Sequence, residues 1–334
     1  MARSNHRSII SIFGIICILA FFLSSSPAIA QEIIISNYKA VYGYGTYNTH
    51  DIVFIRKFAR NGVDSYLAVD PQTMETQIIP ARVVTMQPLD RAGLLSKYRD
   101  TPYCRAIVTA QKQSFALQDA GIIHGFPKEH GITLTIDLCP SHKPLDRIVF
   151  TSLITEFQKI EKPVPVALSI SGRFMLTHGE DIKWLKGLVS TGDIAVTWVN
   201  HTYNHHFDPK KPLKDNFLLE PGTDLDFEIL GTEIAMLEHG LVPSVFFRFP
   251  GLVSDNSIVG KVTNYGLIPI GSDAWLAKGQ QAKAGSIVLI HGNGNEPLGV
   301  EDFIALLKSQ KSAVLAGQWL LYDLREAVDD EFKE

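Results

Sequence analysis

Cysteine is scarce in this sequence, with only Cys17, Cys104 and Cys139 among 334 residues. So few thiols exclude a small scaffold that depends on several disulfides for its stability. An oxidising compartment would permit one bond between Cys104 and Cys139, and the sequence leaves that pairing open.

A surplus of charge of one sign and repeated patterns are also absent. The chain has 31 Lys and Arg against 35 Asp and Glu, a formal net charge of −4, and these charges are scattered. A nucleic-acid partner requires a basic surface, so we expect none. We find no internal repeat, no low-complexity tract and no Gly-x-Ser-x-Gly elbow of a serine hydrolase. With 46% hydrophobic and 20% charged residues, the composition is that of a globular protein with a substantial core.

The first thirty residues have the pattern of a secretory signal. Arg3 and Arg7 precede an apolar stretch over residues 9–23, and small residues stand before Gln31. The apolar stretch is shorter than the roughly 20 residues that a membrane-spanning helix needs. We therefore expect cleavage after Ala30, export to the periplasm or the extracellular space, and no stable membrane span in the processed chain.

Two regions follow the predicted signal. Residues 31–125 contain short β-rich runs such as Ile52–Ile55 and Tyr66–Val69, and they predict a small β-rich module. Within it, Tyr42–Tyr47 either offers rings for stacking on sugars or is a glycine-loosened loop with half-buried tyrosines. From residue 126 to 334, short apolar runs alternate with helical patterns. This alternation predicts an α/β fold of βα units around a parallel sheet or barrel.

Polar side chains stand at the carboxyl ends of five predicted strands in the second region. They are Asp137, His201 after Asn200, Arg248, Asp273 and His291. In a βα barrel the loops at these strand ends share one face, and active sites lie there. We therefore expect these side chains to meet in one site.

A pair of histidines within this set has the spacing of a metal site. His201 and His205 are four residues apart, which on a helical turn places both imidazoles on one face. His206 is a third candidate ligand. Neutral imidazoles suit zinc and cobalt better than magnesium or calcium, so we expect a divalent metal, with zinc the first choice.

Taken in order, five segments resemble the motifs of the polysaccharide deacetylases of the NodB-homology type, carbohydrate esterase family 4. The segments are Leu134–Ser141, Asn200–His205, Phe247–Pro250, Ser272–Trp275 and Val288–His291. The resemblance covers residues 131–309. It implies a distorted (β/α) barrel that acts on a carbohydrate polymer with N-acetylated sugars.

The resemblance also implies a role for each strand-end side chain. Asp137 would be the general base and His291 the general acid, while the two histidines of the second motif would bind the metal. Arg248 would orient Asp137, and Asp273 would hold and tune His291. Water bound to the metal would attack the amide, the carboxylate would take a proton, and the imidazolium would give one to the leaving nitrogen.

The sequence departs from the family pattern in two motifs. Leu138 stands where the first motif has a metal-binding Asp, Cys139 replaces a Gly, and Gly251 replaces the Tyr of the third motif. A Leu cannot bind metal, so the site lacks one ligand. Three substitutes are available: Asp137, His206, or the thiolate of Cys139.

Two hypotheses of different classes follow. The first is an exported metal-dependent hydrolase that removes N-acetyl groups from a carbohydrate polymer. The second is a glycan-binding or scaffold protein whose barrel has lost catalysis together with the metal-binding Asp.

Overall fold

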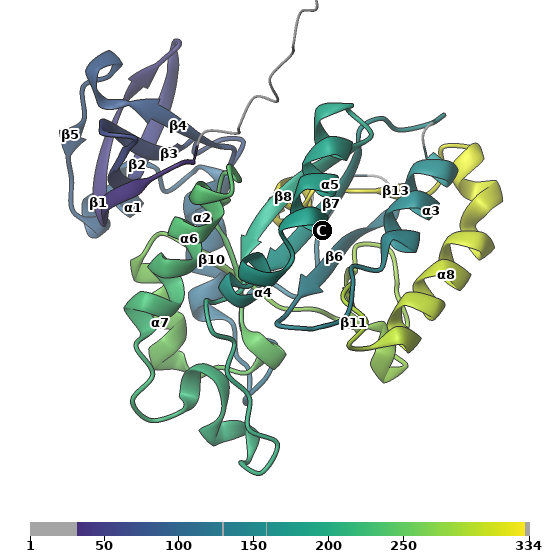
Figure 1. Ribbon diagram of the computed structural model, residues 1–334. Coiled ribbons are helices and arrows are strands. Elements are labelled where there is room, and N and C mark those ends of the chain that lie inside the picture. Colours follow the sequence, from purple (N-terminus) through teal and green to yellow (C-terminus); the bar gives the residue numbers. More distant parts are fainter. Residues whose placement is uncertain (1–31, 129, 158, 331–334) are drawn as a thin grey trace, which may run out of the picture. The chain divides into compact units, whose positions relative to one another are not determined.

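The computed structural model describes residues 32–330 apart from residues 129 and 158 (Figure 1). The expected signal sequence, residues 1–30, lies outside the described residues. Within the described range no helix is both long and apolar enough to cross a membrane.

The first region folds into an antiparallel sheet with the strand order β4-β3-β2-β1-β5. The strands are β1 Ile35–Tyr47, β2 His50–Arg60, β3 Val63–Val69, β4 Thr76–Pro80 and β5 Gln87–Pro88. Asn61 and Gly62, with φ of 49° and 78°, form the tight turn between β2 and β3, because positive φ matches the twist of a two-residue hairpin. The tyrosines of residues 42–47 are partly buried, but they lie in β1. The interpretation of this stretch as a loop is therefore wrong.

The second region contains a parallel sheet with the strand order β10-β9-β8-β7-β6-β12-β11, and β13 pairs with β6. The strands are β6 Gly131–Leu138, β7 Val164–Ile170, β8 Ile194–Asn200, β9 Phe246–Arg248, β10 Ile268–Ile270, β11 Ala274–Trp275, β12 Ile287–His291 and β13 Leu320–Leu321. Every pairing in this sheet is parallel. The expected α/β class, with a curled parallel sheet and a separate β-rich part, is confirmed.

Helices connect the parallel strands and follow the first sheet. They are α1 Arg91–Lys97, α2 Pro102–Lys112, α3 Arg147–Phe157, α4 Gly172–Thr177, α5 Gly179–Ser190, α6 Thr232–Glu238, α7 Asn256–Asn264, α8 Pro297–Leu315 and α9 Leu324–Val328. A π-helical turn, Phe227–Gly231, leads into α6. In Figure 1, α3 and α8 lie side by side, in agreement with their contacts.

The two sheets share part of one hydrophobic core. A single buried cluster contains Val53 and Ile55 of the first sheet and Phe246 and Ile268 of the second. Such mixed packing arises because β2 is buried along most of its length instead of alternating between a wet and a dry face. The expected domain boundary at residue 125 stays a prediction.

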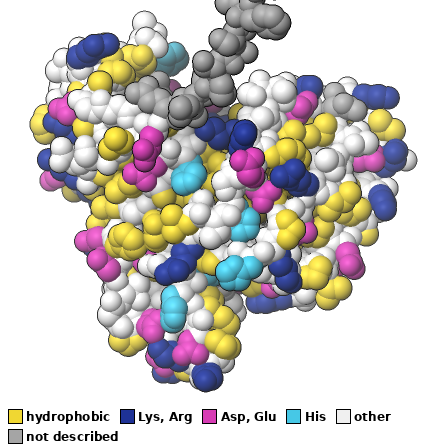
Figure 2. All heavy atoms as spheres, viewed as in Figure 1, with side chains coloured by type: hydrophobic (Ala, Val, Ile, Leu, Met, Phe, Trp, Pro, Cys, Tyr) yellow, Lys and Arg dark blue, Asp and Glu magenta, His cyan; other side chains and the backbone are white. Residues whose placement is uncertain are grey.

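The face drawn in Figure 2 carries charged side chains of both signs. On this face, basic and acidic side chains are interspersed, and hydrophobic side chains occur among them in small groups.

Glu161, in the loop between α3 and β7, is a partly buried carboxyl group. Its Oε2 is buried without a hydrogen-bond partner. Burial raises the pKa of Glu161 to about 7, and the negative charge of Glu326 adds to this increase, while a hydrogen bond from the Leu321 backbone opposes it.

Glu161→Gln is expected to make the protein more stable at pH 8 and to change little at pH 4. The folded chain keeps a proton that the unfolded chain loses from about pH 4.5 upward, so the free energy of unfolding of the wild type falls as pH rises from about 4.5 to 7. We expect a gain of about 1–2 kcal/mol at pH 8, measured by urea denaturation. The exposed Glu301→Gln is the control, and an equal gain in both variants would contradict a specific effect of burial.

Candidate metal centre and active site

The carboxyl ends of neighbouring parallel strands bring the predicted side chains together. Asp137 lies in β6, and its partner in the ladder to β12 is His291. Asn200, which ends β8, pairs with Phe247 of β9, so His201 follows β8 beside Arg248. The convergence on one edge follows from parallel strands, whose ends all face the same way.

Three side chains form a group that is able to hold a metal ion. Cys139 Sγ and one ring nitrogen each of His201 and His205 lie within 4.8 Å of one another. Cys139 Sγ is 3.5 Å from His201 Nε2. A thiolate and two imidazoles are ligands that zinc prefers, and three protein ligands leave a position for water, as in catalytic zinc sites.

The hydrogen bonds around the histidines fit a metal at this place. His201 Nδ1 lies 2.9 Å from the backbone oxygen of Arg248, so Nδ1 donates this bond, and Nε2, on the side of Cys139, is the nitrogen that would bind a metal. Such a bond to the far nitrogen is the usual way to fix the tautomer of a metal-binding imidazole. His205 Nε2 is buried and has no hydrogen-bond partner. An orphaned ring nitrogen beside a thiol is the atom that a metal would satisfy.

Strand geometry explains why the thiol is at position 139 and not at 138. Side chains alternate between the two faces of a strand, so Asp137 and Cys139 point to one face and Leu138 points to the other. Leu138 is 0% exposed and packs in the main apolar cluster of the parallel sheet. Asn293 Nδ2 donates to the Cys139 backbone oxygen at 2.6 Å and so holds the residue directly after β6.

The other two substitutes for the missing ligand are placed differently. His206 is not part of the group of donors: its Nδ1 contacts Glu220 Oε2 at 2.6 Å, and its side chain is 61% exposed. Asp137 Oδ2 is 3.7 Å from His201 Nε2, so this carboxylate flanks the donors.

The thiol of Cys139 lies among imidazoles. Burial alone would raise its pKa, but His205, His291 and His201 hold the pKa of Cys139 well below its usual range. Neighbouring positive charge favours the thiolate, which is the form that binds metal.

Asp137 and Arg248 are both buried, and they form an ion pair that is too long for a hydrogen bond. Arg248 Nε is 4.0 Å from Asp137 Oδ1, and Arg248 Nη2 donates to Thr135 Oγ1 at 2.7 Å. Asp137 Oδ1, Arg248 Nε and Arg248 Nη1 have no hydrogen-bond partner. Burial lowers the pKa of Arg248, although the charge of Asp137 counteracts this. The carboxylate thus retains free acceptor capacity toward a small molecule at the strand ends.

His291 has a different carboxylate partner from the one predicted. Its Nδ1 lies 2.8 Å from Glu296 Oε2, which also accepts a hydrogen bond from Trp275 Nε1 at 2.7 Å. Burial would lower the pKa of His291, but Cys139, Glu296 and Asp137 raise it well above its usual value. Glu296 therefore favours the imidazolium form, as a general acid requires. In the sequence, Glu296 is marked only by its position five residues after His291 and directly before Pro297, which begins α8.

The predicted role of Asp273 as the partner of His291 is wrong. Asp273 Oδ2 bonds to His124 Nδ1 at 2.7 Å, and Oδ1 accepts from the backbone nitrogen of Ile287 at 3.1 Å. The reason is strand register: Ala274 pairs with Val288, so Asp273 is level with the start of β12. His291 is four residues further along β12 than this level, which corresponds to about 13 Å along the strand.

The segment between His201 and His205 is not the helical turn that the spacing predicts. Thr202 and His205 have φ of 67° and 50°, which is unusual for residues with a side chain. Glu228 holds this shape: its Oε2 accepts from the backbone nitrogens of Tyr203 and Asn204 at 2.9 Å each, and its Oε1 accepts from Asn204 Nδ2 at 2.7 Å. Tertiary hydrogen bonds therefore override the helical spacing.

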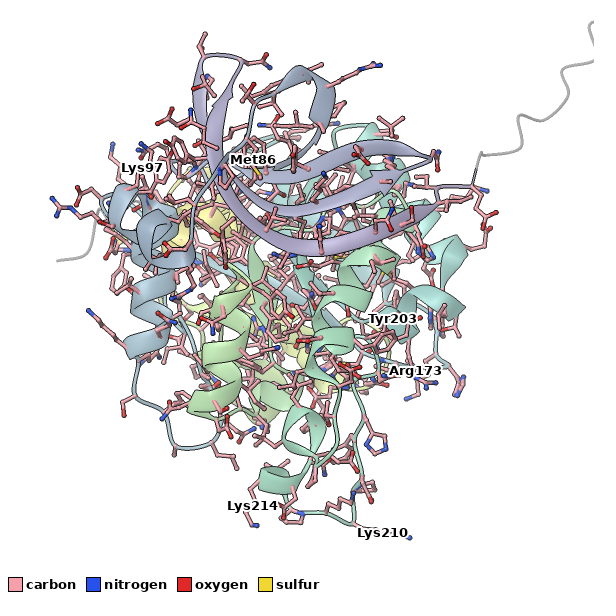
Figure 3. The ribbon with its side chains drawn as sticks, turned by 90° about the vertical axis from the view of Figure 1, so that its left-hand side faces the viewer. Met86, Lys97, Arg173, Tyr203, Lys210 and Lys214 are labelled. Atoms are coloured by element: carbon pink, nitrogen blue, oxygen red, sulfur yellow. The ribbon has the colours of Figure 1, made fainter. Side chains whose placement is uncertain are left out.

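A pocket of about 640 Å³ opens beside the donors, and His205 and Thr202 are part of its wall. Phe207 and Phe217 also line the pocket and form a stacked pair with ring centroids 5.0 Å apart, and the Phe217 ring lies edge-on to His205 at 5.6 Å. Arg173 also lines the pocket and is labelled next to Tyr203 in Figure 3. Its backbone nitrogen donates to the Tyr203 backbone oxygen at 2.9 Å. An open pocket with aromatic walls suits a large polar molecule.

No family model matches the sequence. Among solved structures, a family 4 carbohydrate esterase from Streptomyces lividans is 15% identical with a TM-score of 0.39, covering 57% of this chain and 91% of that one. A family 4 carbohydrate esterase from Bacillus anthracis is 16% identical with a TM-score of 0.46, covering 63% and 87%. A family 4 pseudoenzyme from Bacillus anthracis is 15% identical with a TM-score of 0.43, covering 68% and 82%. The solved structures to which this chain is similar thus include members of carbohydrate esterase family 4, the family that its five sequence motifs resemble.

Proposed function

We propose that this chain is an exported, metal-dependent hydrolase that removes N-acetyl groups from a carbohydrate polymer. The observation that carries the proposal is the donor group of Cys139, His201 and His205, with Asp137 on one flank and His291 close to the thiol. Amide hydrolysis needs an electrophilic activator, a base and an acid. An ion held by the three donors would be the activator, and Asp137 and His291 would be the base and the acid.

A divalent ion on these donors would supply the positive charge that polarises an amide carbonyl and lowers the pKa of water. Asp137 takes a proton from the attacking water, since its Oδ1 is buried and free of hydrogen bonds. His291 delivers a proton to the departing nitrogen, and Glu296 holds the imidazole in place through Nδ1. Arg248, with Nε 4.0 Å from Asp137 Oδ1, places a positive charge beside this carboxylate.

The pocket beside the donors supports a carbohydrate as substrate. Sugar rings present apolar C–H faces that stack on aromatic rings, and Phe207 and Phe227 in the pocket wall are 49% and 44% exposed. Because the pocket is open, it can accept one unit of a long polymer while its neighbours extend into solvent.

The test is acetate release from an N-acetylglucosamine oligomer by protein loaded with zinc or cobalt. We expect release by the wild type, and Asp137→Asn should lower kcat by about 10²–10⁴-fold while the metal content stays the same. Asp273→Asn is the matched control, because Asp273 bonds to His124 and Ile287 away from the donors. Absence of acetate at saturating metal would contradict the proposal.

The second candidate is a glycan-binding protein that has lost catalysis, and Gly251 favours it. Gly251 has φ of 59°, and a Cβ at this position would lie 2.7 Å from a ring carbon of Phe217. A tyrosine therefore cannot take this place without moving Phe217, and the substrate site differs here from the family pattern.

Leu138→Asp distinguishes a lost ligand from a replaced one. If Cys139 replaces the family's aspartate, Leu138→Asp gains no metal affinity and loses about 3 kcal/mol or more of stability, because it buries a carboxylate among apolar side chains. Metal binding by calorimetry and urea denaturation measure the two effects. A large rise in metal affinity would instead indicate a degraded native site and would support the second candidate.

A further inference from the structure

A second recess lies in the β-rich part of the chain. It has a volume of about 570 Å³, and its wall comes from the end of β1, the start of β2, the segment before β5 and the end of α1. None of its lining residues belongs to the metal centre.

Glycines in β1 allow the segment before β5 to pack against this strand beside the recess. A Cβ on Gly43 would lie 2.7 Å from the backbone oxygen of Gln87, and one on Gly45 would lie 2.7 Å from that of Thr85. The segment 85–87 therefore lies directly against β1, which any larger residue would prevent. Met86 and Lys97 are labelled at this end of the antiparallel sheet in Figure 3.

Two cations in the wall have no carboxylate partner. Arg82 and Lys97 form no ion pair in the part of the chain that the structure describes, and Asp51 is the one acidic residue of the lining. Lys97 Nζ lies 4.5 Å from the ring centroid of Tyr44 and 5.5 Å from that of Tyr98. The two rings thus position the ammonium group through cation–π contacts.

A hydroxyl in the same wall also lacks a partner. Tyr98 is 6% exposed, and its hydroxyl is buried without a hydrogen bond. Burial, with the charge of Asp51 adding to it, raises the pKa of Tyr98 to about 12, so the group keeps its proton and is able to donate. Buried hydroxyls in native proteins usually have a partner.

We propose that this recess binds an acidic sugar unit of a glycan. Arg82 and Lys97 supply the positive charge that a carboxylate needs, and the polar groups of Thr46, Asp51 and Gln87 suit the ring hydroxyls. If the function proposed above holds, the β-rich part anchors the polymer whose N-acetyl groups the metal centre removes.

The test compares two tetrasaccharides by isothermal titration calorimetry with the purified protein. One is a hyaluronan tetrasaccharide, in which N-acetylglucosamine alternates with glucuronic acid, and the other is the neutral chitotetraose. We expect the acidic ligand to bind at least about tenfold more tightly, with an affinity that falls as salt is added. Equal affinity for both ligands, or no binding of either, would overturn the proposal.

Variants locate the binding. Lys97→Gln and Arg82→Gln should each weaken binding of the hyaluronan tetrasaccharide about tenfold, as expected for a lost charge-assisted hydrogen bond. Lys39→Gln, which removes an exposed charge of β1 outside the recess, should not.

A variant of the metal centre separates this proposal from the proposed function. His205→Ala should abolish acetate release and leave binding of the hyaluronan tetrasaccharide unchanged. Loss of that binding in His205→Ala would place the sugar at the metal centre and overturn the assignment to the recess. Failure of acetate release in the wild type would contradict the proposed function alone.

Discussion

Cys139→Ala is expected to lower zinc affinity and kcat/KM by about 10³-fold each. The substitution removes one of the three metal-binding donors, and with it the negative charge of the thiolate that partly neutralises the cation. Zinc affinity is measured by competition with a chelator, and kcat/KM by acetate release. The cobalt-loaded wild type should also show thiolate-to-cobalt charge-transfer absorption, which Cys139→Ala should lack.

Cys104→Ala is the matched control for this experiment. Both cysteines are buried and neither forms a disulfide. Cys104 packs in the core shared by the two sheets and is not one of the metal-binding donors. It should therefore retain metal binding and activity. If Cys139→Ala keeps its zinc while Asp137→Asn loses it, the third ligand is the carboxylate and the thiol is structural.

Arg56→Met is expected to lower the free energy of unfolding by about 3–5 kcal/mol, since it leaves Glu233 as an unpaired buried charge. Both side chains are fully buried, with Arg56 Nε 2.6 Å from Glu233 Oε2 and Nη2 2.8 Å from Oε1. Tyr38 donates its hydroxyl hydrogen to the same carboxylate at 2.8 Å. Arg56 lies in β2 and Glu233 in α6, so the pair connects the antiparallel sheet to the helix after the π-helical turn. Urea denaturation measures the loss.

Two further variants separate the pair from a general loss of packing. Arg56→Met combined with Glu233→Leu removes both charges and should recover much of the stability, because apolar groups of similar size replace a desolvated pair. Asp193→Asn breaks the exposed pair with Lys162 and should change stability little. A double variant as unstable as Arg56→Met alone would show that shape, not charge, accounts for the loss.

The same helix connects this ion pair to the metal centre. Glu228 stands in the π-helical turn directly before α6 and holds the backbone of Tyr203 and Asn204. Asn200 Nδ2 also donates to the Ile229 oxygen at 2.8 Å. The loop that carries His201 and His205 therefore depends on a turn about 25 residues later in the chain, which no local pattern indicates.

The sequence alone was sufficient for the fold class and for the side chains at the carboxyl ends of β6, β8, β9 and β12. Asp137, His201, Arg248 and His291 each follow an apolar run, and parallel strands place such positions on one edge whatever the loops do. Only the tertiary structure decided which side chains interact at that edge. Cys139 joins the histidines because strand alternation turns Leu138 into the core, and Glu296 replaces Asp273 because the register of β11 against β12 sets Asp273 at the opposite end of the strand. Register and loop conformation depend on contacts between residues far apart in the chain, and these are the features that periodicity and spacing do not encode.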